Sequence, residues 1–228
     1  MKKQLSVIPS RREACWAIAY LFFELLALPV ILAALSGSLP TPLTSAQLNL
    51  AFFAINFVAV AVILRKFLSQ ALRTPGVLRS VVTALLGLGA YWLCNHLVTA
   101  LIAVLDPTFS NVNDAGIADM AQQDFLLTCI GTVALVPASE ELLFRGVLFG
   151  RLYPRSKAAA FAVSTPCFCA VHVVGYLGLY PWGTLALCFL QYIPAGLCLG
   201  WAYARSGSIL APIIMHTVIN AVGLFLVR

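Results

Sequence analysis

Long apolar runs dominate the chain and are separated by short polar connections. A helix needs about 20 apolar residues to cross the hydrocarbon core of a bilayer. Runs of this kind predict seven spanning helices, and the pattern therefore indicates an all-α polytopic membrane protein. The seven segments are 14–35, 46–64, 77–105, 124–152, 158–177, 183–204 and 209–227.

Composition supports the same class. Hydrophobic residues make up 61% of the 228 residues and charged residues only 10%, whereas soluble domains carry roughly 45–50% and about 25%. A soluble globule, a disordered chain and a disulfide-stapled secreted domain are all excluded on this ground. We expect a single membrane domain that covers residues 1–228.

The basic residues follow a topological pattern. Twelve of the 14 Lys and Arg residues fall on alternate connections, so all twelve lie on one side of the membrane, while the loops 36–45 and 106–123 contain none. The positive-inside rule then places the N-terminus in the cytoplasm and 106–123 outside. We expect a multi-pass protein of a prokaryotic inner (plasma) membrane. Topology explains the net charge of +6, so no nucleic-acid partner is expected.

Ionisable residues inside such segments are costly and point to function. The segment 124–152 contains Glu140, Glu141 and Arg145. Helical spacing puts Glu141 and Arg145 one turn apart on one face, where they can form an ion pair, and turns Glu140 about 100° away. Pro137 removes a backbone hydrogen bond just before this cluster and can open the helix there.

Two later segments add polar pairs with the same four-residue spacing. Phe168 precedes His172 in one segment, and His216 precedes Asn220 in the other. Each pair alone is weak evidence, because a single histidine in an apolar helix is commonly a packing residue. At 1.5 Å per residue, however, Glu140, His172 and Asn220 lie at about 18, 21 and 16–17 Å from the cytoplasmic ends of their helices, with His216 at about 10 Å.

Side chains of these types at one depth suit hydrolysis without a serine or cysteine nucleophile. Glu140 can take a proton from an attacking water, and His172 can hold that water and later protonate the leaving nitrogen. His216 and Asn220 can donate hydrogen bonds to the developing oxyanion. Glu24 and His96 are also ionisable residues in apolar segments, but they belong to no such pattern, and we expect Glu24→Gln and His96→Ala to remain active.

The three motifs Glu-Glu-x-x-x-Arg (140–145), Phe-x-x-x-His (168–172) and His-x-x-x-Asn (216–220) resemble the CPBP family. That family contains the CAAX prenyl proteases and bacteriocin-processing or immunity-type membrane proteins. The resemblance covers roughly 124–221, whereas the first 120 residues resemble nothing specific. It divides the chain into N-terminal transmembrane helices (1–123) and a catalytic core (124–228), and some relatives have eight spans rather than seven.

The resemblance implies an intramembrane endopeptidase of the glutamate type, acting on a membrane-associated protein or peptide. Glu140 and His172 would activate water, His216 and Asn220 would form the oxyanion site, and Glu141, Arg145 and Phe168 would support them. The prediction is a site without a cofactor. The alternative is zinc held by Glu140, His172 and His216, since these are also zinc ligands.

Two other functions compete with proteolysis. The family resemblance also allows a non-enzymatic membrane scaffold or a bacteriocin self-immunity protein. A proton-coupled transporter would show repeats with paired broken helices, and the sequence shows no such symmetry. The expected partners are a peptide or membrane-protein substrate and the lipid bilayer.

Overall fold

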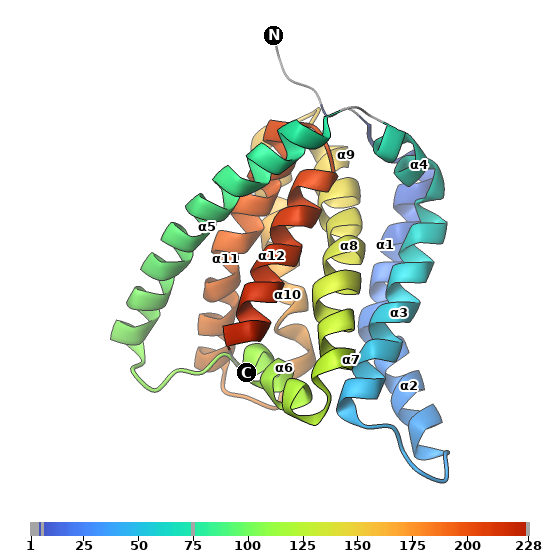
Figure 1. The fold of residues 1–228 in the computed structure, drawn as a ribbon, viewed down its shortest axis with the longest axis vertical. Coiled ribbons are helices and arrows are strands. Elements are labelled where there is room, and N and C mark those ends of the chain that lie inside the picture. Colours follow the sequence, from blue (N-terminus) through green and yellow to red (C-terminus); the bar gives the residue numbers. More distant parts are fainter. Residues whose placement is uncertain (1–4, 6, 74–75, 227–228) are drawn as a thin grey trace.

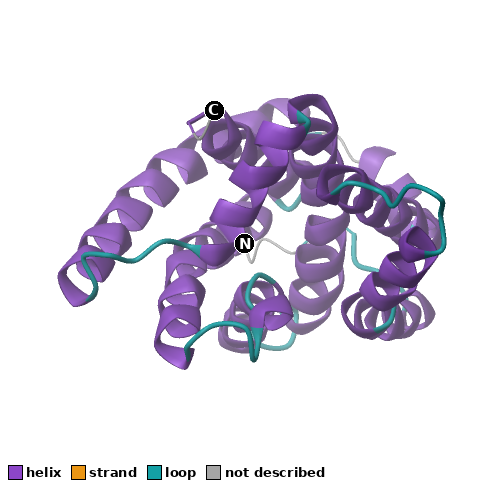
Figure 2. Cartoon of the chain, turned by 90° about the horizontal axis from the view of Figure 1, so that it is seen from below, coloured by secondary structure: helices purple, strands orange, loops and turns teal. Residues whose placement is uncertain are grey.

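The described residues form helices joined by loops and contain no strand (Figure 2). The computed structural model describes residues 5, 7–73 and 76–226. The predicted all-α class is confirmed. The elements are α1 (Arg11–Leu26), α2 (Leu28–Gly37), α3 (Ser45–Ile63), α4 (Arg65–Arg73), α5 (Val77–Leu105), α6 (Val112–Gln123), α7 (Phe125–Cys129), η1 (Ile130–Leu135), α8 (Val136–Glu141), η2 (Leu142–Phe149), α9 (Gly150–Leu152), α10 (Lys157–Val171), η3 (Val174–Tyr176), α11 (Trp182–Ser206) and α12 (Leu210–Leu226).

All seven predicted segments contain helix, but not all are long enough to span a bilayer. By length and hydropathy four described stretches qualify, namely α3, α5, α11 and the continuous unit Phe125–Leu152. The bent pair α1–α2 makes a fifth if it counts as one span. The helices α10 and α12, with 15 and 17 residues, are apolar but shorter. The chain is a polytopic membrane protein, in which four or five of the described stretches meet this length criterion where the sequence predicted about seven spans.

A proline explains the bend between α1 and α2. The axes of α1 and α2 differ by 43°, and Pro29 occupies the first turn of α2. Proline has no N–H to donate and its ring crowds the preceding turn, so a helix kinks at this point. Near the bend, α1 carries Glu24, whose side chain is buried.

The fifth predicted segment ends earlier than expected. The helix α10 stops at Val171, with His172 as its C-cap, and a 3₁₀ turn follows where 158–177 had been predicted as one helix. The chain then passes Gly178, whose φ of +80° favours glycine. Because the helix ends here, His172 lies at the helix terminus rather than inside the helix, and it belongs to the site described below.

Two connections are themselves helical. The helix α4 carries a basic, polar face and buries Phe67 on its other side, where the backbone N–H of Phe67 donates to Glu13 Oε1 at 2.9 Å. The helix α6 begins at the cap residue Asn111, whose side-chain oxygen accepts from the backbone N–H of Asn113 and of Asp114. Loops had been expected over both stretches.

The basic connections gather at one end of the bundle. Figure 1 shows the start of α1, α4, α9 and the start of α5 at the same end. Contacts across this end join distant segments, because Arg151 donates to the carbonyl of Pro9 at 3.2 Å and Arg79 donates to the carbonyl of Arg205. The geometry agrees with basic residues on one side of the membrane, and the cytoplasmic orientation stays a prediction.

The C-terminal helices pack closely around the unit Phe125–Leu152. In Figure 1, α8 lies between α12 and α3, and both of these helices contact it. Small residues allow close approach: a Cβ on Gly196 of α11 would come within 2.7 Å of Thr165 Cγ2 of α10. This tight packing brings the polar residues of α8, α10 and α12 together.

Candidate active site

The helix that carries the two glutamates changes its hydrogen-bond register at Pro137. The backbone N–H of Val136 bonds to the carbonyl of Gly131, five residues back, as in a π-helix. The next bond in this register would run from residue 137 to the carbonyl of Thr132, but proline has no N–H. The side-chain amide of Asn220 donates to that Thr132 carbonyl instead, at 2.9 Å. Pro137 therefore explains why an asparagine of α12 attaches to this helix. Such π-turns are frequent at functional sites.

A buried charge network lies directly beneath. Arg145 Nη1 donates to Glu141 Oε1 at 3.0 Å, and both side chains have zero exposure, which confirms the predicted ion pair. The same oxygen is 2.9 Å from His216 Nδ1. Because a carboxylate only accepts, His216 must donate from Nδ1. Arg145 Nη2 also donates to the carbonyl of Gly196 at 3.2 Å. The network ties α8 and η2 to α11 and α12.

Phe168 is at the centre of the site's apolar packing. Its ring lies 4.2 Å from the guanidinium carbon of Arg145, a cation–π arrangement. The ring centroids of His172 and His216 lie 4.8 and 5.8 Å from that of Phe168. One buried phenyl ring thus contacts the arginine and both histidines.

His172 is oriented by the end of its own helix. At the C-cap, the backbone N–H of His172 bonds to Cys169, three residues back, so the carbonyl of Phe168 lacks its usual backbone donor. His172 Nδ1 lies 2.8 Å from that carbonyl. A carbonyl only accepts, so Nδ1 carries the hydrogen, and in a neutral ring Nε2 holds the free lone pair.

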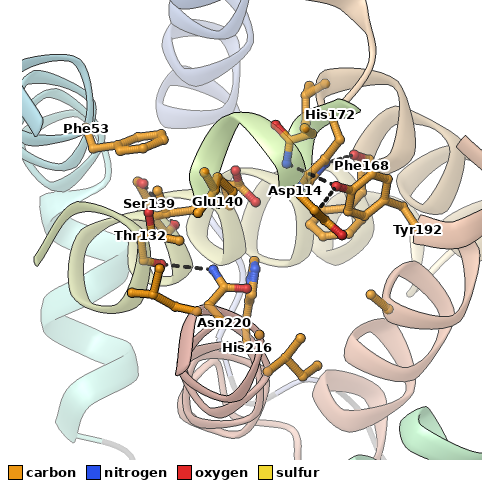
Figure 3. A pocket seen from close by; sticks show the side chains of 18 of the residues that line it. Phe53, Asp114, Thr132, Ser139, Glu140, Phe168, His172, Tyr192, His216 and Asn220 are labelled. Atoms are coloured by element: carbon orange, nitrogen blue, oxygen red, sulfur yellow. Dashed lines mark hydrogen bonds between the residues drawn. The ribbon is translucent and has the colours of Figure 1, made fainter. Parts of the chain in front are cut away.

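Five motif residues, Glu140, Phe168, His172, His216 and Asn220, line one cavity of about 620 Å³. Figure 3 shows Glu140, His172, His216 and Asn220 around it, from α8, α10 and α12. Glu140 lines the cavity and its Oε2 has no hydrogen-bond partner, whereas Glu141 is buried in the packing. The two adjacent carboxyls therefore have separate surroundings, as the helical spacing predicts. Within the described chain, the matched depths are consistent with this common cavity.

The contacts restrict what His216 and Asn220 can donate. Asn220 uses one amide hydrogen on Thr132, which leaves the second for a ligand. His216 gives its Nδ1 hydrogen to Glu141. A second donation from Nε2 requires the ring to be protonated on both nitrogens, whereas the neutral ring presents a lone pair there. Asn220 is therefore the simpler of the two donors toward an oxyanion.

Ser139 is not arranged as a nucleophile. Its hydroxyl lies 3.0 Å from the carbonyl of Leu135 and 3.1 Å from that of Val136, so its hydrogen is directed at the helix backbone. This agrees with a hydrolytic scheme in which water is the nucleophile.

Sequence reasoning missed a residue next to His172. The ring of Tyr192, on α11, lies 4.1 Å from the His172 ring at an interplanar angle of 31°. The Tyr192 hydroxyl accepts from Asn113 at 3.0 Å and donates to Asp114 at 2.9 Å (Figure 3). A tyrosine in an apolar helix carries no charge and so did not stand out. The polar residue Gln191 stands next to Tyr192 in the same apolar segment and could have drawn attention to this position. Its side chain accepts a hydrogen bond from Asn111 at 3.0 Å.

The two ionisable residues that belong to no motif differ in position. His96 is exposed on α5 and does not line the cavity. Glu24 does line the cavity, and the survival of activity in Glu24→Gln stays a prediction. Its position follows from packing of α1 beside α3, which no local pattern in the sequence reveals.

The zinc alternative requires Glu140, His172 and His216 to converge as ligands. Among the described residues, no three His, Cys, Asp or Glu side chains gather closely enough to hold a metal ion. Nδ1 of each histidine donates a hydrogen bond, which leaves Nε2 as the nitrogen that is available to a ligand. The metal-free site stays a prediction, and no step below passes through a metal.

Comparison with known proteins supports the motif reading. Residues 122–222 match the family model described as type II CAAX prenyl endopeptidase Rce1-like. The UPF0177 protein YxdF of Lactococcus lactis subsp. lactis (strain IL1403) is 30% identical over 130 residues, which is 57% of this chain and 67% of that protein. The chain belongs to the CPBP family. At the family level this indicates a CAAX-type membrane protease. No solved structure matches the chain significantly.

Proposed function

We propose that this CPBP protein is an intramembrane endopeptidase that hydrolyses a peptide bond of a membrane-associated protein or peptide with a water activated by Glu140. The observation that carries the proposal is the pairing of two groups on one cavity. Glu140 has an oxygen without a partner, and His172 is fixed with its Nε2 lone pair available. Together they provide two proton acceptors for one water.

The reaction follows from these atoms. Water, held by Glu140 and His172 Nε2, attacks the carbonyl carbon and gives one proton to the Glu140 carboxylate. The free amide hydrogen of Asn220 donates to the oxygen that becomes negative. The proton then passes to the leaving nitrogen, the C–N bond breaks, and a carboxylic acid and an amine result. Glu141 and Arg145 hold His216 and the α8–η2 backbone in place throughout.

Peptide hydrolysis by the purified protein tests the proposal. Quenched fluorescent peptides are offered to the parent, Glu140→Gln and His172→Ala in liposomes. Both variants should lose measurable hydrolysis, because each lacks a group that handles the proton of the attacking water. Matched controls are Asp119→Asn and His96→Ala, which remove the same kinds of side chain at exposed positions off the cavity. Both controls should cleave like the parent.

Two outcomes would redirect the proposal. If Glu140→Gln cleaves as fast as the parent, the glutamate mechanism fails. If the parent itself cleaves no peptide, the scaffold or self-immunity function takes its place. A chelator series addresses zinc separately. Activity that survives exhaustive chelation supports water activation by Glu140 and His172, whereas activity lost and restored only by zinc contradicts the metal-free site.

A further inference from the structure

The cavity has a second wall, which the three family motifs do not include. It is formed by α1 and α3 and lined by Glu24, Leu25, Asn49, Phe52, Phe53 and Asn56. Figure 3 places Phe53 of α3 to one side of Glu140, and His172 and Tyr192 to the other. A bound peptide that reaches Glu140 therefore lies next to this second wall as well.

Unpartnered hydrogen-bond acceptors gather on this wall. Glu24 is 8% exposed, and its Oε2 has no hydrogen-bond partner. Asn49 Oδ1 is likewise buried without a partner. Buried polar groups are nearly always paired, so this wall offers acceptors to the hydrogen-bond donors of a ligand.

Charge points to the kind of donor. Glu24, Glu140 and Asp114 all line the cavity, and no lysine or arginine is among the described residues that line it. The guanidinium group of Arg145 forms an ion pair with Glu141 and lies against the ring of Phe168. Carboxyl groups without a neighbouring cation give the cavity an acidic character, which favours a positively charged ligand.

We propose that Glu24 and the acceptors around it form a subsite for a basic side chain, lysine or arginine, of the peptide substrate. The proposal rests on the proposed proteolytic function and adds a substrate class to it. An ammonium or guanidinium group carries several N–H donors and no acceptor, so it matches a wall that holds acceptors. Its hydrogen bonds to a carboxylate are charge-assisted and stronger than neutral ones. A peptide with only apolar side chains leaves Glu24 unpaired.

Binding can be measured without relying on cleavage. The probe is an Ala- and Leu-rich peptide with a photo-crosslinker and one central lysine, and its twin carries norleucine in place of the lysine. Crosslinking in nanodiscs is titrated for Glu140→Gln protein, which removes hydrolysis and the other glutamate from the comparison. The same background then carries Glu24→Gln, Glu24→Asp or Asp119→Asn. Each peptide partitions into the bilayer to the same extent for every variant. A change between variants in the ratio of lysine-peptide affinity to norleucine-peptide affinity therefore reports on the subsite.

Glu140→Gln protein should bind the lysine peptide about tenfold more tightly than its twin, the ratio expected from one charge-assisted hydrogen bond. Glu24→Gln should bring the ratio close to one. Glu24→Asp should keep part of it, and the exposed control Asp119→Asn all of it. A ratio of one before Glu24 is changed, or an equal ratio after Glu24→Gln, overturns the subsite. If the preference depends on Glu24 but the parent cleaves no peptide, the subsite stands and the proteolytic function fails.

Discussion

The C-terminal helices and the N-terminal helices use similar apolar sequences in different ways. In the most apolar stretch of Phe125–Leu152, 50% of the residues are buried inside the protein, and in α11 44% are. The corresponding fractions are 17% in α3 and 11% in α5. The first two helices are packed by other helices, whereas α5 presents side chains such as Leu85 and Val104 outward. Hydropathy alone does not distinguish them, because lipid and a protein interior favour the same residues.

This contrast explains where charge is tolerated. Arg145 and Glu141 have zero exposure and are paired, hydrogen-bonded and covered by an aromatic ring. On a lipid-facing surface such as that of α5, the same residues would have no protein partners. The following predictions test the contrast between the more buried C-terminal helices and the more exposed N-terminal ones.

The largest stability effect is expected at Arg145. Arg145→Ala leaves Glu141 buried with one charged donor fewer, and breaking a buried pair costs about 3–5 kcal/mol. Arg79→Ala, which removes an exposed arginine that contacts a backbone carbonyl, should cost about 0–1 kcal/mol, the range for exposed ionic contacts. Thermal unfolding in detergent measures both. Equal melting temperatures for the two variants would contradict the buried pair.

Asn220→Ala should lower the rate of peptide hydrolysis by about 10²–10³, the loss found when one oxyanion donor is removed. It also leaves the Thr132 carbonyl without the donor that compensates for Pro137. Hydrolysis rates and melting temperatures are therefore measured on the same samples. A variant that melts like the parent and cleaves at an unchanged rate would remove Asn220 from the site.

A pair of glycine substitutions compares packed and open helix surface. Gly196→Ala places a Cβ 2.7 Å from Thr165 Cγ2, and overpacking of this kind costs about 1–3 kcal/mol. A Cβ on Gly89 of α5 meets nothing within 4 Å. Gly89→Ala should therefore raise the free energy of unfolding by about 0.5–1 kcal/mol, because alanine loses less backbone freedom on folding than glycine. Opposite shifts in melting temperature are expected. Shifts of the same sign would mean that α10 and α11 are not in close contact there.

The smallest effect is expected for Tyr192→Phe. This change keeps the ring that stacks on His172 but removes the hydroxyl that contacts Asp114 and Asn113. A hydrogen bond contributes about 0.5–1.5 kcal/mol net, so activity should fall only a few-fold. Tyr192→Ala should reduce it further, because the stacking partner of His172 is lost. If both substitutions lower hydrolysis equally, the hydroxyl rather than the ring is what positions His172.

Much of the site was predictable from local spacing. The i, i+4 relation of Glu141 to Arg145 is fixed by helix geometry, and so is the separate direction of Glu140. The approximate depth of the three polar clusters follows from the rise per residue. These inferences need only a regular helix, so they hold without knowledge of how the helices pack.

The sequence by itself determined an all-α membrane protein and the residues of its three motifs, because hydropathy and helical periodicity are local properties. Only the tertiary structure decided that His216 attaches to Glu141, that Asn220 replaces the bond lost at Pro137, and that Tyr192 stacks on His172. The same holds for Glu24, which reaches the cavity through packing of α1 beside α3. The physical reason is that such contacts join residues far apart in the chain, and their partners depend on how close neighbouring helices approach and how each is turned about its axis.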